Sequence, residues 1–134
     1  MYLKKLVKKL DGKKRRKALI KACDKLVRQL VFHRDQNTCQ YCGKQPEKLD
    51  PHHIYGRRIY SLRWVLDNLI TLCSGCHMQI AHAQPVVFIE YIRCRLGDNG
   101  LDKLKLKKNS TFKTSVSNLE LFKLKLEREN EKIN

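Results

Sequence analysis

The sequence lacks any long apolar run and contains few acidic residues. No stretch approaches the roughly 18 to 20 apolar residues that a membrane-spanning helix needs. Lysines interrupt the N-terminus every few residues, so we do not expect a secretory signal, which requires an apolar core. Only 13 residues are acidic against 29 lysines and arginines, a formal net charge of +16. We therefore expect a cytoplasmic protein that makes no membrane contact and binds a polyanion.

The chain is also short and shows no internal repeat. Its 134 residues suffice for one small hydrophobic core but not for two full ones. Changes in composition divide it into a basic N-terminal arm (1–17), a central domain (18–100) and a lysine-rich linker with a C-terminal helix (101–134). The arm is either a short amphipathic helix or a flexible segment that binds phosphate. Gly12 is the only residue in it that suggests an interruption of the helix.

Helical periodicity appears in three places. Apolar residues recur every three to four positions in residues 14–35, which predicts a helix of about six turns with Cys23 in its buried stripe rather than on a metal. A second helix is predicted from Pro85, with a stop at Gly97. The third follows Ser117, which has capping-box spacing to Glu120. The apolar row of this third helix either packs on the domain or binds a partner.

Two CxxC pairs point to a metal. The pairs are separated by 30 residues, and each CxxC turn directs two thiolates at one ion. In a reducing compartment this spacing favours structural zinc over disulfides. A site closed by four thiolates leaves no coordination position open for chemistry. The predicted zinc ligands are Cys39, Cys42, Cys73 and Cys76.

Strand-like segments LDPHHIY and LITLC lie between these pairs, and a helix signal returns after Cys76. Adjacent residues on a strand point to opposite faces, so His52 and His53 can address a metal and a water separately. A neutral imidazole suits proton abstraction near pH 7, and a divalent ion beside it stabilises developing phosphate charge. A zinc ion bound by both CxxC turns would hold them together. Because His77 directly follows Cys76, the zinc knot also fixes the direction of the His77 side chain.

The motifs CQYC, PHHI, LDNLITLC and SGCH resemble those of the HNH, or ββα-metal, endonucleases that carry a four-cysteine zinc knot. The resemblance covers roughly residues 37–82. The flanking segments are also similar to phage-encoded HNH proteins related to the NinG recombination proteins. The resemblance implies a small α+β fold, in which a ββα-metal core with its zinc knot is flanked by N- and C-terminal helices.

Roles carried over from the family concern four positions. The resemblance implies that His52 and His77 bind a catalytic Mg²⁺, Mn²⁺, Ni²⁺ or Zn²⁺, that His53 is the general base, and that Asn68 orders the metal loop. The family usually places a further histidine four residues after the last one, whereas His82 lies five after His77, about 140° away in an ideal helix. His82 is therefore either a ligand in a distorted helix or a substrate contact, with Asn68 or water replacing it.

Basic residues are the candidate DNA contacts. Guanidinium groups in the loop after the histidine pair suit phosphate binding or transition-state charge, although such groups are often simply solvated. Arg57 is the choice for a catalytic role because it lies close to His53 in sequence. Trp64 is interpreted as an apolar anchor. The predicted nucleic-acid-binding residues are Arg58, Arg63, Lys13, Lys14, Arg15 and Arg16.

Three functions remain open from the sequence. The first is a metal-dependent endonuclease that cuts duplex or branched DNA with low or structure-selective specificity. The second is a non-catalytic, zinc-stabilised nucleic-acid-binding module. The third is a phage recombination or packaging accessory in a bacterial host cell, with a phage protein or a second copy of the chain as its partner.

Overall fold

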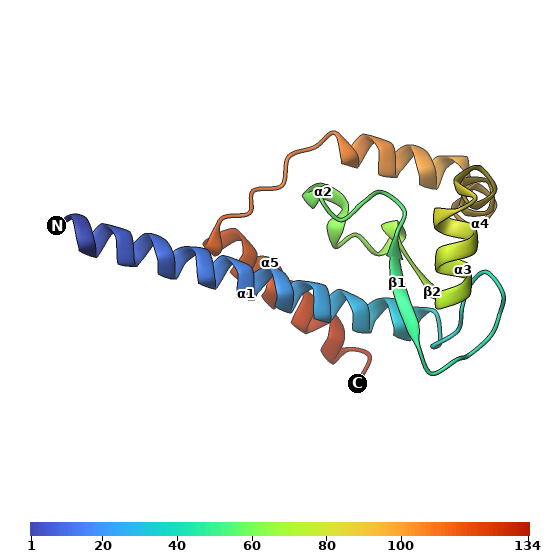
Figure 1. Cartoon of the computed structure of the whole chain (residues 1–134), viewed down its shortest axis with the longest axis horizontal. Coiled ribbons are helices and arrows are strands. Elements are labelled where there is room, and N and C mark those ends of the chain that lie inside the picture. Colours follow the sequence, from blue (N-terminus) through green and yellow to red (C-terminus); the bar gives the residue numbers. More distant parts are fainter.

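The computed structural model describes all 134 residues, and one long helix runs along the molecule. Helix α1 spans Tyr2–Arg34, and its N-terminal part projects away from the rest of the chain (Figure 1). The break expected at Gly12 is wrong, and residues 1–17 continue the helix. A glycine inside a helix costs only about 1 kcal/mol, and the surrounding leucines, lysines and arginines are good helix formers. None of the helices is both long enough and apolar enough to cross a bilayer.

A two-stranded antiparallel sheet forms the centre of the fold. Strand β1 (Leu49–His53) pairs with β2 (Leu69–Cys73), and His52 lies opposite Ile70. The short helices α2 (Tyr60–Arg63) and η1 (Leu66–Asn68) connect the two strands. The helical segments α3 (Ser74–Cys76) and η2 (His77–His82) follow β2 directly. The predicted α+β fold, with a ββα core between flanking helices, is confirmed.

Two further helices follow the sheet. Helix α4 spans Pro85–Lys108 and bends at Gly97, whose φ of 73° is left-handed. The stop predicted at Gly97 is therefore confirmed as the end of the first of two helices that meet at this kink. The linker predicted from residue 101 is wrong up to residue 108, because the second helix continues there and buries Leu101 and Leu104. Helix α5 spans Val116–Glu131. Its cap is Ser115, whose hydroxyl accepts from the Asn118 amide, rather than the predicted Ser117.

Helix α5 docks on α1, so the terminal helix is part of the fold (Figure 1). Leu119 and Leu126 pack with Val27 of α1 and with Trp64, which is 4% exposed and serves as the predicted apolar anchor. The Asn130 amide donates to the Leu26 carbonyl at 3.1 Å. A second apolar cluster joins the other part of the sheet to α4, and it contains Cys39, Leu49, Ile70, Leu72, Ala81, Phe88, Ile92 and Leu101.

The buried carboxylate of Asp35 connects the end of α1 to β2. It accepts hydrogen bonds from the Thr71 backbone amide at 3.0 Å, from Arg95 at 3.1 Å and from Arg34 at 2.8 and 2.9 Å. Burial opposes ionisation, but these donors prevail and hold the pKa of Asp35 below its ordinary value. The charge-assisted bonds fix the sheet against α1.

Replacing Leu119 with alanine tests the docking of α5. Leu119 is fully buried, so the cavity left behind is expected to lower the free energy of unfolding by about 2–5 kcal/mol. Leu121 lies on the same helix and is 68% exposed, so L121A is the matched control, with an expected change within about 0.5 kcal/mol. Urea denaturation measures both. Equal stability of the two variants would mean that α5 does not pack on α1 in solution.

Candidate active site and metal centres

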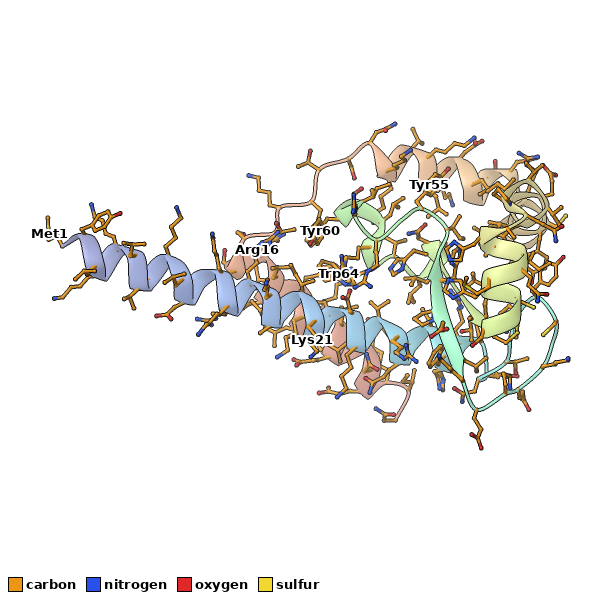
Figure 2. The ribbon with its side chains drawn as sticks, viewed as in Figure 1. Met1, Arg16, Lys21, Tyr55, Tyr60 and Trp64 are labelled. Carbon is orange, nitrogen blue, oxygen red and sulfur yellow. The ribbon has the colours of Figure 1, made fainter.

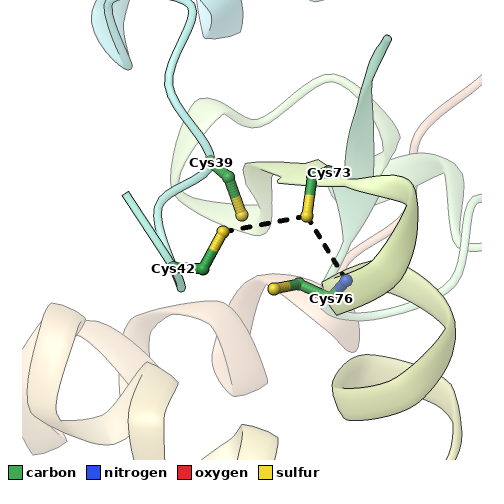
Figure 3. Close-up of side chains that lie close together, drawn as sticks. All are labelled: Cys39, Cys42, Cys73 and Cys76. Carbon is green, nitrogen blue, oxygen red and sulfur yellow. Dashed lines mark hydrogen bonds between the residues drawn. The ribbon is translucent and has the colours of Figure 1, made fainter. Parts of the chain in front are cut away.

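The four cysteines of the two CxxC pairs converge on one point. Figure 3 shows the four side chains gathered together, and their sulfur atoms all lie within 4.8 Å of one another. The Sγ atoms of Cys42 and Cys73 are 3.8 Å apart, which is the spacing that a tetrahedral ion with Zn–S bonds of about 2.3 Å requires. A disulfide would need about 2.05 Å. The donor set therefore fits zinc.

Backbone amides favour the thiolate form of Cys39 in this cluster. Burial alone would raise the pKa of the Cys39 thiol, but amide donors from Cys42, Cys73 and Tyr41 lower it to about 7. The Cys76 amide also points at the Cys73 sulfur, at 3.4 Å. N–H groups directed at sulfur favour thiolates, which are the form that binds metal.

Three histidines form a second cluster next to the first. Donor nitrogens of His52, His77 and His82 all lie within 4.8 Å of one another. The Nε2 atoms of His77 and His82 are 3.0 Å apart. The five-residue spacing is accommodated because η2 is a π-helix, in which the Ala83 amide bonds to the Met78 carbonyl five residues earlier. The local distortion thus places both rings on one face.

His52 comes from β1 and is half-buried. Its ring packs edge-on against Phe88, with centroids 5.2 Å apart, and against His77, at 5.0 Å. Burial, followed by the neighbouring charges of His77 and His82, lowers the pKa of His52 to about 4. The ring is therefore neutral at pH 7 and keeps a lone pair for a cation.

Asp50 adds a carboxylate that the sequence reasoning missed. It precedes His52 by two residues on β1, so the two side chains share a face of the sheet. Its Oδ2 atom lies 3.7 Å from Nδ1 of His77. A carboxylate at this position favours the tautomer with the proton on Nδ1, which leaves Nε2 facing the cluster. The period-two spacing from His52 was the available signal.

His53 points to the other side of β1 and is held by one hydrogen bond. Its Nε2 atom lies 2.9 Å from the carbonyl oxygen of Arg63. Since a carbonyl can only accept, Nε2 carries the proton and Nδ1 keeps a free lone pair. Burial lowers the pKa of His53 below its ordinary value, although the Arg63 carbonyl opposes the shift. The neutral ring is thus ready to accept a proton at Nδ1.

Asn68 ties the connecting loop to the sheet. It is fully buried, and its Oδ1 accepts from the Tyr55 amide at 2.8 Å. Its Nδ2 donates to the carbonyls of Tyr55 at 3.0 Å and Leu62 at 3.1 Å. The side chain makes no contact with the histidine cluster, so it holds the loop rather than replacing a ligand.

Asp24 of α1 organises the loop that follows the histidine pair. It accepts from Arg63 at 2.7 and 2.9 Å and from the Trp64 indole at 2.8 Å. Burial opposes its ionisation, but these donors keep the pKa of Asp24 low. Arg57 reaches the same carboxylate at 3.3 Å while its side chain stays 65% exposed. No local sequence signal marks Asp24, because its partners lie more than 30 residues away.

These groups line one open pocket of about 560 Å³. Its walls come from α1, β1, the connecting loop and η2. Trp64 also lines the pocket, and Figure 2 labels it beside α1. The pocket gathers His53, the three clustered histidines and three arginines in one place. Its polar lining includes Asp24, Arg28, Asp50, His52, His53, Arg57, Arg63, His77 and His82.

The six predicted DNA-binding residues lie in different settings. Lys13, Lys14 and Arg58 are exposed. Arg15 instead pairs with Glu120 of α5, and Arg16 donates to Thr114 at 2.7 and 3.0 Å. Arg63 is 8% exposed. Arg15 and Arg16 thus fasten the C-terminal segment, and Arg63 positions His53 through its carbonyl.

Comparison with known proteins agrees with the motifs. Residues 39–82 match the family described as HNH endonuclease. This segment contains both cysteine pairs and all of the clustered histidines. No curated protein and no solved structure matches the chain.

Proposed function

We propose that the protein is a metal-dependent nuclease that hydrolyses DNA phosphodiester bonds, because residues 39–82 match the HNH endonuclease family. The observation that carries the proposal is the convergence of His52, His77 and His82 beside the free Nδ1 of His53 in one basic pocket. A metal site and a base on opposite faces of a single strand match the two requirements of phosphodiester hydrolysis.

The three clustered histidines are the proposed ligands of the catalytic ion. Neutral imidazoles favour Ni²⁺ and Zn²⁺ over Mg²⁺ and Mn²⁺, which prefer oxygen donors. The fit is supported by the lowered pKa of His52 and by the carboxylate of Asp50 behind His77. A divalent ion held there supplies stabilisation of the negative charge that develops on the phosphate.

His53 is the proposed general base. Its Nδ1 lone pair takes a proton from the attacking water, while its Nε2–H keeps donating to the Arg63 carbonyl, so the ring keeps its orientation during the transfer. Asn68 holds the loop that carries this carbonyl by bonding to Leu62. The Arg63 carbonyl therefore fixes the position of the base directly, and Asn68 fixes it through the loop.

Arg57 is proposed to contact the reacting phosphate. Its guanidinium is exposed and lines the pocket. It donates one long hydrogen bond of 3.3 Å to Asp24, which also accepts shorter hydrogen bonds from Arg63 and Trp64. The neighbouring Arg58 is exposed and supports binding of adjacent phosphates. With phosphate contacts dominant and no base-reading element identified, we propose low or structure-selective specificity.

A plasmid-nicking assay tests the function. Supercoiled DNA is incubated with the protein and Mg²⁺, Mn²⁺, Ni²⁺ or Zn²⁺, and EDTA serves as the control. We expect nicking with at least one transition ion and none with EDTA. DNA binding without cleavage under every ion would instead support the non-catalytic, zinc-stabilised binding module.

Replacing Asp50 with asparagine tests how the metal site is supported. The amide keeps the shape but removes the charge behind His77, so affinity for Ni²⁺ is expected to fall by about 10- to 100-fold. Isothermal titration of zinc-loaded protein measures the affinity. Asp102 is exposed on α4, and D102N is the matched control with unchanged affinity. If D50N binds Ni²⁺ as tightly as the wild type, Asp50 has no part in the site.

A further inference from the structure

One face of α1 carries a row of basic residues that leads out of the pocket. The residues of this row follow one another at steps of three and four positions, which places them on the same side of the helix. They are, in order, Lys14, Lys17, Lys21, the acidic Asp24 and Arg28. The last two of these line the pocket. The three lysines continue the same face toward the projecting end of α1, and Figure 2 labels Lys21 on this part of the helix.

The lysines in this row are free to bind an outside anion. Lys14, Lys17 and Lys21 are exposed, and none of them takes part in an ion pair. The one acid on the face, Asp24, is held by Arg63 and Trp64. By contrast, Arg15 on a different side of α1 is already neutralised by Glu120.

The row has the length of a DNA-backbone contact. From Lys14 to Arg28 the helix rises about 21 Å, which corresponds to about six base pairs at roughly 3.4 Å each. Because these charges stand on one continuous helix, they stay in line and cannot turn toward acidic groups elsewhere in the protein. A stiff, linear polyanion is therefore the partner that engages all of them at once.

We propose that Lys14, Lys17 and Lys21, in line with Arg28, form a track for the phosphates of duplex DNA that extends the substrate path from the pocket along α1. The inference rests on the proposed nuclease function. It assigns to this helix the positioning of DNA outside the cleavage site, and it predicts that duplexes long enough to reach α1 bind more tightly than duplexes that fill only the pocket.

A triple variant, K14Q/K17Q/K21Q, tests the track. Affinity for a fluorescent duplex spanning the pocket and α1 is measured by anisotropy at several salt concentrations, without added divalent ions. Loss of three phosphate contacts is expected to reduce the slope of log affinity against log salt by about 2.7, because each contact contributes about 0.9. Glutamine preserves helix propensity, and circular dichroism verifies the helix.

The control removes the same number of charges from the same helix. K5Q/K8Q/K9Q changes exposed lysines, and Lys5 and Lys8 lie nine residues before Lys14 and Lys17, which is half a turn away in an ideal helix. The track predicts a much smaller change in slope for this control. Equal changes in the salt slope of both triple variants, or no change in the slope of the track variant, would overturn the inference. Nicking by the wild type would still uphold the proposed function in that case. A wild type that neither binds nor nicks DNA would overturn both.

Discussion

Replacing His53 with alanine is expected to slow plasmid nicking by about 10²- to 10⁴-fold, the usual contribution of a positioned general base. The variant removes the only imidazole on the face of β1 opposite the metal cluster. It leaves the four cysteines and His52, His77 and His82 unchanged, so zinc content and Ni²⁺ affinity should persist. Single-turnover nicking with saturating Ni²⁺ measures the chemical step.

The fifth histidine of the chain provides a matched control. His33 is exposed near the end of α1, and H33A should nick DNA at the wild-type rate. Nicking by H53A at the wild-type rate would remove His53 from the mechanism. A slow variant that has also lost zinc or unfolds at a lower urea concentration would assign His53 a structural role instead.

Replacing Cys39 with serine is expected to cause the largest loss of stability. Structural zinc sites contribute on the order of 10 kcal/mol to the folding of small zinc-dependent domains. The sheet in the segment that Cys39 helps to hold has only two strands, and a two-stranded sheet is marginal on its own. Loss of zinc should therefore unfold residues 39–82 and disperse the histidine cluster, because His77 directly follows Cys76.

Zinc content and amide hydrogen exchange check this expectation. Protection of the β1 and β2 amides should disappear in C39S, whereas the α1–α5 pair keeps a separate apolar cluster. Cys94 is exposed, so C94S is the control and should retain both zinc and protection. A C39S protein with full protection of the sheet would show that the cysteines do not depend on an ion for their arrangement.

Short-range patterns predicted the centre of the fold. The CxxC pairs, the two strands and the histidine pair are each encoded within a few residues, so their types and approximate bounds follow from local spacing. The helix at residues 14–35 follows from its apolar repeat, and Cys23 is buried as predicted. The sequence predicts the start of the linker too early, because Leu101 and Leu104 stand among lysines and only their burial against the domain shows that this segment is helical.

Features that depend on tertiary packing could not be predicted from local patterns. Asp24 meets Arg63 across 39 residues, and Asp35 meets Arg95 across 60. Nothing near either acid in the sequence marks its partner. The convergence of His77 and His82 depends on a π-helix, which differs little from an α-helix in local composition. For the same reason, local sequence does not distinguish Arg15 and Arg16 from free basic residues, because their partners Glu120 and Thr114 lie far along the chain.

The central claim is that three imidazoles share one open cation next to a separate, sulfur-bound zinc. The most direct test is Ni²⁺ titration of zinc-loaded protein, wild type and H77A, with metal analysis of both. We expect the wild type to bind one Ni²⁺ in addition to its zinc, and H77A to keep the zinc while losing most of its Ni²⁺ affinity. Unchanged Ni²⁺ binding by H77A would contradict the account.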